Sequence, residues 1–152
     1  MPVVSLLIAA ALAAPAPAAI PELPKALSTV LRDYRAAMEA RSIEELAAVF
    51  DADLFLFEGT HKNVGWADYR DNHIGPEMKD WSAFKVVDAR VADAVLGDDL
   101  AYVATESIYR IVSEGKTVDI AAAESFVLVH RGAAWKIRHL HYSGKKLDRA
   151  AH

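Results

Sequence analysis

Imidazole and carboxylate side chains are the groups in this sequence that could bind a metal ion or move a proton. His139 and His141 stand two residues apart, so in a β-strand both side chains point to one face. With Glu58, or with His61, this pair could hold a divalent ion such as zinc, because imidazole and carboxylate suit that metal. Such residues more commonly line a wet pocket, and we expect no metal or other cofactor.

The same types of side chain suit proton transfer without a metal. A neutral histidine titrates near pH ~6.5, so it could act as an acid or a base near neutral pH. His73 or His139, paired with a glutamate, could then catalyse a dehydration or a cyclisation. The spacing does not select one partner from the three glutamates considered, which are Glu58, Glu106 and Glu124.

The composition excludes several classes of protein. The 152 residues carry a formal net charge of −4 and show no basic face, which argues against a nucleic-acid partner. The absence of cysteine rules out disulfides, thiolate metal sites and a cysteine nucleophile. The glycine-rich phosphate loop, the Gly-x-Ser-x-Gly turn and the His-Glu-x-x-His helix are also missing. We interpret the basic residues Lys145, Lys146 and Arg149 as part of a polar tail over 145–152.

The first twenty residues have the pattern of a secretory signal. Residues 3–14 form an uncharged apolar run, which is shorter than the ~20 residues that span a bilayer but fits the apolar region of a signal peptide. Ala16-Pro17-Ala18 then gives a small-x-small cleavage pattern. We expect a signal peptide over 1–19, a linker over 20–25, a periplasmic or secreted protein, and no membrane partner after processing. The alternative is a buried N-terminal helix, since no lysine or arginine precedes the run.

Two helices are expected before the first strand. Between Pro24 and about Ala40, apolar residues recur at three- and four-residue steps, which predicts an amphipathic helix. These residues are Leu27, Val30, Leu31, Tyr34, Ala37 and Met38. Ser42 and Glu45 then have the spacing of a capping box, which predicts a second helix that ends at residues 51–53.

A sheet is expected over most of the remaining chain. An apolar stretch at 54–57 predicts one strand, and the segment after it has room for a short helix over 65–73, which Pro76 should end. Short turns between four longer runs predict antiparallel hairpins. These four strands span residues 81–96, 100–112, 117–130 and 134–143. One face of the second of them carries Tyr102, Ala104, Glu106 and Ile108. Helices followed by such strands predict an α+β fold.

Two stretches of the sequence are similar to a known family. The first reads LRDYRAAMEARSIEELAAVFDADLFLFEG, and the second reads WKIRHLHYSG. They resemble the opening helices and the closing strand of the NTF2-like superfamily, in particular its SnoaL-like and DUF4440-type domains with the ketosteroid isomerase-like fold. The resemblance covers residues 26–144. It implies a cone-shaped barrel, in which a curved antiparallel sheet wraps around the N-terminal helices and leaves a pocket at its open end.

The resemblance also implies roles for three residues. Ketosteroid isomerases have a tyrosine in the first helix and an aspartate at the end of the first strand, and these positions correspond to Tyr34 and Glu58. Glu58 would take a proton from a carbon beside a carbonyl, while Tyr34 would donate a hydrogen bond to the oxygen. A third acid of that family aligns with Phe126, two residues from Glu124. Glu124 is therefore the third catalytic candidate.

The remaining candidates would contact a ligand. The resemblance places the two histidines of the closing strand inside the cone, together with Trp135 and Ile137. It places Trp66 and Tyr69 at the mouth, where aromatic rings could stack on a flat apolar ligand. The expected ligand-binding residues are Trp66, Tyr69, His73, Glu106, His139 and His141.

Together these patterns predict an exported domain that binds a small molecule in the pocket of the cone. It could be an enzyme of the isomerase, dehydratase or cyclase type, acting by acid–base chemistry on a carbonyl-bearing or cyclic ligand. One alternative is a non-catalytic binding module, and apolar residues on both faces of the strand at 81–96 favour a homodimer. Another alternative is a divalent-metal protein that uses the histidines.

Overall fold

The computed structural model describes residues 22–148, so the expected signal peptide over 1–19 and the last residues of the tail lie outside it. Two helices come first, α1 (Lys25–Ala40) and α2 (Ile43–Val49), and the strands β1 (Phe50–Glu58) and β2 (His61–Val64) follow. Three short helical segments come next: α3 (Trp66–Tyr69), the π-helical turn η1 (Arg70–Ile74) and α4 (Gly75–Asp80). The long strands are β3 (Trp81–Leu96), β4 (Leu100–Ser113), β5 (Lys116–Arg131) and β6 (Ala134–Lys146).

Both N-terminal helices begin where the sequence predicts. The periodic apolar residues of α1 make one buried face, which includes Leu31, Tyr34 and Met38. α1 ends at Ala40, and the left-handed backbone of the next residue, Arg41 (φ 52°), turns the chain into α2. Ser42 caps α2, because its hydroxyl accepts a hydrogen bond from the backbone N–H of Glu45 at 3.1 Å.

The six strands form one sheet in the order β2-β1-β6-β5-β4-β3. Strands β3 to β6 make the predicted antiparallel hairpins. β1 pairs with β6 in parallel, however, so the sheet is mixed and not wholly antiparallel. The difference arises because β1 joins the sheet beside a strand from the other end of the chain, and no short turn dictates their relative direction.

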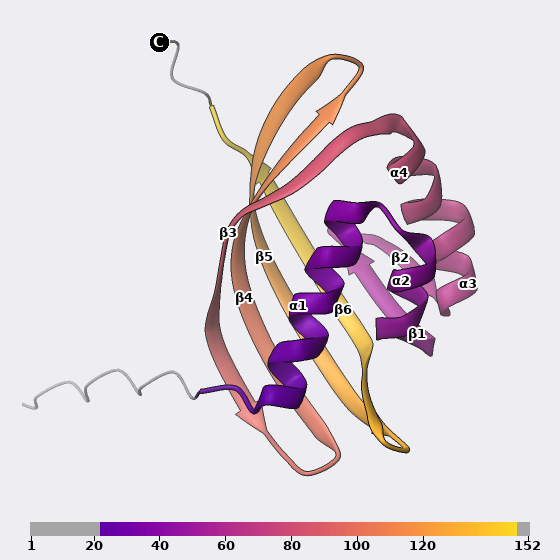
Figure 1. Cartoon of the computed structure of the whole chain (residues 1–152), viewed down its shortest axis with the longest axis vertical. Coiled ribbons are helices and arrows are strands. Elements are labelled where there is room, and N and C mark those ends of the chain that lie inside the picture. Colours follow the sequence, from indigo (N-terminus) through magenta and orange to yellow (C-terminus); the bar gives the residue numbers. More distant parts are fainter. Residues whose placement is uncertain (1–21, 149–152) are drawn as a thin grey trace, which may run out of the picture.

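The sheet is bent around α1 and stays open. Figure 1 shows α1 in the hollow of the bent sheet, with α3 and α4 on the side where β1 lies. β2 and β3 are the two free edges, so the strands do not close into a barrel. The predicted α+β cone with a sheet wrapped around an N-terminal helix is confirmed in this open form.

The segments around β1 and α4 differ from the prediction. α2 ends at Val49, before residues 51–53, because Phe50 already pairs with Ile137 of β6. Pro76 lies in the first turn of α4, so it begins a helix and does not end one. Proline suits this position because the first N–H groups of a helix have no partner within it. The sequence also gave no indication of β2.

The core lies between α1 and the concave face of the sheet. Val103, Phe126 and Leu128 of β4 and β5 point to α1 and are fully buried. The residues between them in each strand point to the convex face, and the predicted face with Tyr102 and Glu106 is this outer one. None of the described helices is both long and apolar enough to cross a lipid bilayer.

Candidate functional site

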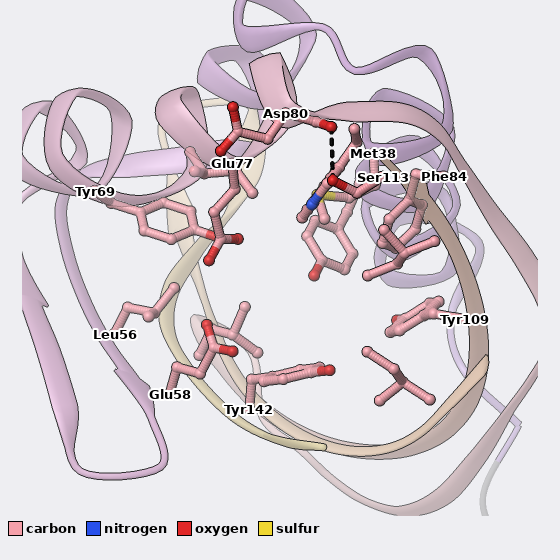
Figure 2. Close-up of a pocket in the computed structure, with 16 residues that line it drawn as sticks. Met38, Leu56, Glu58, Tyr69, Glu77, Asp80, Phe84, Tyr109, Ser113 and Tyr142 are labelled. Atoms are coloured by element: carbon pink, nitrogen blue, oxygen red, sulfur yellow. Dashed lines mark hydrogen bonds between the residues drawn. The ribbon is translucent and has the colours of Figure 1, made fainter. Parts of the chain in front are cut away.

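Side chains leave a cavity of about 330 Å³ between α1, α4 and the concave face of the sheet. Its walls come from most elements of the fold, with Tyr34 on α1, Glu58 on β1, Tyr69 on α3, Tyr109 on β4 and Tyr142 on β6. Figure 2 shows four of these side chains around the open space. The volume is at the lower end of the range for small-molecule sites.

Glu58, His73 and Glu77 form a charged cluster at one wall of this cavity. Nε2 of His73 lies 2.8 Å from Oε2 of Glu58 and 3.5 Å from Oε1 of Glu77. The interaction with Glu58, followed by that with Glu77, raises the pKa of His73 from 6.5 to about 9, although burial acts in the opposite direction. The imidazole is therefore a cation at neutral pH and bridges the two carboxylates.

Asn63 of β2 fixes the orientation of this imidazole. The Asn63 side chain is buried, and its Nδ2 donates a hydrogen bond to Oδ2 of Asp68 at 3.1 Å. Its Oδ1 is therefore the acceptor for Nδ1 of His73, which lies 2.7 Å away. Asp68 is held in turn by the N–H of Val64 and the amide of Asn72. With Nδ1 committed to Asn63, His73 presents Nε2 to the glutamates.

The same cluster is the one group of three among residues 22–148 whose side chains could hold a metal ion. The ligand atoms of Glu58, His73 and Glu77 lie within 4.8 Å of one another. One imidazole and two carboxylates suit a divalent transition metal. Because a metal would need the unprotonated Nε2 of His73, metal and proton compete for the cluster.

A second polar cluster lies behind the tyrosines that line the cavity. Glu124 is 2% exposed, and its carboxylate accepts hydrogen bonds from four hydroxyl groups. The donors are Tyr34 at 3.3 Å, Thr105 at 3.0 Å, Ser107 at 3.1 Å and Tyr109 at 2.7 Å. Burial, and then the charge of Glu124, raises the pKa of both tyrosines. Tyr34 therefore directs its proton to Glu124 and not to the cavity, in contrast to the role that the resemblance implies.

The two histidines of β6 lie on the convex face, away from the cavity. β6 carries one extra residue, Arg138, between the pairs that Ile137 and His139 form with β5. Such a β-bulge moves all later side chains to the other face of the strand. Ile137 is therefore fully buried in the core, while His139 and His141 point outward, in contrast to the interior position expected from the resemblance.

Three of the predicted ligand-binding residues thus have their contacts on the convex face. Glu106 is exposed and forms an ion pair with an arginine of β3. The ring of His139 stacks on Phe55, with 6.1 Å between centroids, and His141 lies 5.9 Å from Phe57. Burial lowers the pKa of His139. The alternative metal set of His139 and His141 with Glu58 or His61 does not come together among the described residues.

The two predicted aromatic residues of α3 have different surroundings. Tyr69 lines the cavity. Trp66 stacks on Phe50 at 5.4 Å, so it belongs to the packing that supports Tyr69. The structure thus brings four predicted site residues together at or beside the cavity, namely Tyr34, Glu58, Tyr69 and His73.

Several residues of the site were not identified from the sequence. Glu77 stands four residues after His73, a spacing that puts both on one side of a helix, but we expected Pro76 to end the helix. Asn63 lies in a strand that the sequence did not predict. Tyr142 lines the cavity only because the bulge in β6 turns its side chain to the concave face, and no local sequence pattern predicts this bulge.

Comparisons with known proteins agree with this architecture. A family model for the SnoaL-like domain matches residues 27–145. No curated protein sequence is similar enough to this chain to count as a match.

Solved structures share the fold at low sequence identity. An NTF2-like superfamily protein from Salmonella enterica has a TM-score of 0.68 and 18% identity, over 78% of this chain and 87% of that one. A candidate ketosteroid isomerase from Shewanella frigidimarina has a TM-score of 0.65 and 21% identity, over 78% and 95%. A candidate scytalone dehydratase from Novosphingobium aromaticivorans has a TM-score of 0.67 and 15% identity, over 84% and 88%.

Structural similarity at such low sequence identity establishes the fold, whereas the chemistry depends on the side chains of the site. The family model, in contrast, covers most of the chain, from the first turn of α1 almost to the end of β6. The protein therefore belongs to the SnoaL-like domain family, within the NTF2-like superfamily.

Proposed function

We propose that this domain binds a small, partly apolar molecule in the cavity and acts on it by general acid–base chemistry. The observation that carries the proposal is the position of Glu58. Its side chain lines the cavity, and one of its oxygens lies 2.8 Å from a cationic imidazole. A carboxylate that meets the ligand and is hydrogen-bonded to a proton donor can both take a proton and return one.

The cluster supplies both partners of such a reaction. Glu58 would remove a proton from a carbon of the ligand. His73, held by Asn63 on one side and by two glutamates on the other, would supply the proton that a leaving or acceptor oxygen needs. Glu77 would stabilise the imidazolium before and after the transfer, since it lies 3.5 Å from the same nitrogen.

The direction of the Tyr34 hydroxyl differs from the one that the resemblance implies for isomerisation through an enolate. An enolate oxygen needs donors that point at it from the start. Tyr34 and Tyr109 both donate to Glu124, so their protons are turned away from the cavity. A dehydration needs only a base and an acid near each other, which the cluster offers. The likeness to a candidate scytalone dehydratase supports the same class of reaction.

Exchange of carbon-bound protons in D₂O tests the proposal without knowledge of the natural ligand. The probe is 2-tetralone, a cyclic ketone with acidic C–H groups, and NMR follows the loss of its α-proton signals. The wild-type protein should accelerate this exchange, and Glu58→Gln should lower the protein-dependent rate by roughly 100-fold or more. Glu44→Gln, the same change at an exposed position of α2, is the control. Equal rates for Glu58→Gln and the wild type would contradict a base at this position.

We also propose that the convex face pairs two copies of the chain. One row of cross-strand neighbours runs from β3 to β1, and it consists of Val95, Tyr102, Val127, His139 and Phe55. Four of the five side chains in the row are apolar or aromatic, and Val95 is 65% exposed. An apolar row on the outer face of a sheet favours burial against a partner, and a second copy presents the complementary row.

We further propose that the protein is exported to the periplasm or beyond. The support is the apolar run at 3–14 and the Ala16-Pro17-Ala18 pattern after it. Intact-mass analysis of the cell fractions tests this. A chain that starts near Ala19 or Ile20 in the periplasmic or secreted fraction is the expected result, and a full-length chain confined to the cytoplasmic fraction would contradict it.

A further inference from the structure

The side chains that line the cavity carry negative charge and no fixed positive charge. Glu58, Glu77 and Asp80 are among them, while no lysine or arginine is. The cation in contact with this wall, His73, is shared by Glu58 and Glu77 and can offset only one of the three carboxylates. An anionic ligand would be repelled here, and a cation would be attracted.

The wall opposite these carboxylates is aromatic. The rings of Trp81 and Phe84 stack with 5.2 Å between centroids, and Phe84 lies 5.0 Å from Tyr109. Figure 2 shows Glu58 and Glu77 on one side of the cavity, and Phe84 and Tyr109 on the other. Ring faces attract an organic cation and also pack against its apolar body.

The hydroxyl of Tyr69 is available to a ligand. Its side chain is 5% exposed and points into the cavity (Figure 2), and no other group of residues 22–148 forms a hydrogen bond with this hydroxyl. Burial, and then the charges of Glu77 and Glu58, raises the pKa of Tyr69, so the hydroxyl stays neutral. A neutral phenol oxygen beside carboxylates can accept a hydrogen bond from an ammonium N–H.

From these three features we infer that the ligand of this cavity is a protonated organic amine with an apolar body. Its ammonium group would lie between Glu77, Glu58 and the hydroxyl of Tyr69, and its body would lie against Trp81, Phe84 and Tyr109. The inference deepens the proposed function, since it uses the same cavity, and it names the ligand class by charge.

Three probes of nearly equal size test the charge preference. 2-Phenylethylammonium, 2-phenylethanol and 3-phenylpropionate share a phenyl body and differ mainly in charge. In titration calorimetry with the full-length protein at pH 7, the ammonium should bind at least about tenfold more tightly than the alcohol, and the carboxylate should bind more weakly than either. The inference is overturned if the alcohol or the carboxylate binds as tightly as the ammonium, or if none of the three binds.

Matched variants locate the preference. Glu77→Gln removes one charge from the cavity wall, so it should lower the affinity for the ammonium about fivefold or more and leave that for the alcohol unchanged. Asp93→Asn makes the same charge change at an exposed position of β3 and should alter neither affinity. An equal loss in both variants would mean that overall charge, and not the cavity, attracts the ammonium, which contradicts the inference.

Two further measurements separate this inference from its alternatives. Zn²⁺ alone is titrated in parallel. Tight Zn²⁺ binding without any preference for the ammonium would contradict the inference of an amine ligand and would indicate a metal site at the same cluster. The tetralone exchange assay is independent of ligand charge. If proton exchange depends on Glu58 but the protein shows no preference for the ammonium, only the present inference is contradicted. If the protein prefers the ammonium but does not accelerate exchange, only the catalytic proposal is contradicted.

Discussion

The charge on His73 links the stability of the fold to pH. Its pKa in the folded protein is about 9, against 6.5 for a free imidazole, because Glu58 and Glu77 stabilise the protonated form. A raised pKa stabilises the folded state fully below pH ~6.5, and this contribution is lost as the pH rises through about 9. Both glutamates are partly exposed, so we expect a contribution of about 1–2 kcal/mol, less than the full shift would give.

Urea unfolding of the wild type and His73→Gln between pH 6 and 10 measures this contribution. The free energy of unfolding of the wild type should exceed that of the variant at pH 6, and the difference should fall as the pH rises through about 9. NMR titration of the His73 ring gives the pKa directly. A ring that titrates near 6.5, or a difference in stability that does not change with pH, would show that the cluster is not formed in solution.

The hydrogen bonds that the buried carboxylate of Glu124 accepts should differ in strength from one hydroxyl donor to another. Tyr109 donates at 2.7 Å and Tyr34 at 3.3 Å, so the first hydrogen bond should be the stronger. Hydrogen bonds to a charged group contribute more than neutral ones, and we expect Tyr109→Phe to lower the free energy of unfolding by about 1.5–3 kcal/mol. Tyr34→Phe should lower it by about 1 kcal/mol. Chemical denaturation of both variants checks the order, and a larger loss for Tyr34→Phe would contradict this geometry.

At the scale of elements, the junction between η1 and α4 depends on Gly75. A β-carbon at this position would collide with the carbonyl oxygen of Arg70, which is backbone and cannot move freely. Alanine is normally the better helix former by about 1 kcal/mol. Here we expect the opposite sign, with Gly75→Ala lowering the free energy of unfolding by about 1–3 kcal/mol. A stabilised variant in urea unfolding would show that the junction relaxes easily.

The same junction positions the charged cluster of Glu58, His73 and Glu77, since His73 lies before it and Glu77 after it. Displacement of α4 should lengthen the contact between these two side chains. The pKa of His73 in Gly75→Ala should therefore be lower than in the wild type, which NMR titration would detect in the folded variant. An unchanged pKa would mean that the cluster does not depend on the geometry of the junction.

The elements with strong periodicity were predictable from the sequence, and those set by distant contacts were not. α1 and the capped start of α2 follow from local patterns, and so do the boundaries of the long strands β3 and β4. β2 is four residues long and exists because β1 pairs with it, which no local pattern reveals. The position of Pro76 was misjudged because proline both begins and interrupts helices, and only the surrounding backbone decides between the two.

The site was predictable only in part, for the same reason. Tyr34 and Glu58 were identified through the resemblance, and both line the cavity. The partner of Glu58 could not be selected, because nothing in the sequence around His73, His61 or the histidines of β6 shows which of them contacts Glu58. Which of them meets Glu58 depends on how η1 folds over the end of β1, a tertiary contact. The buried hydroxyl cluster around Glu124 likewise depends on pairing between β4 and β5.

At the scale of the whole molecule, the row of residues on the convex face predicts the state of association. Val127 lies at the centre of this row, between Tyr102 and His139. Val127→Glu would place a charge inside the proposed interface, so light scattering after size-exclusion chromatography should show a dimer for the wild type and a monomer for the variant. Ala47→Glu, on the exposed side of α2, should remain a dimer. A monomeric wild type would contradict the proposal.

The extra residue in β6 has a consequence for how related chains are compared. Arg138 shifts the alternation of the strand between its concave and convex faces by one residue. Odd-numbered side chains such as Ile137 point inward before it, and even-numbered ones such as Leu140 point inward after it. A homologue with the same residues in a regular strand, without the bulge, would present its histidines to the cavity and its tyrosine to the convex face. An alignment that matches the residues but ignores the bulge would therefore transfer residues of the convex face into the cavity, and only the register of the strand reveals the error.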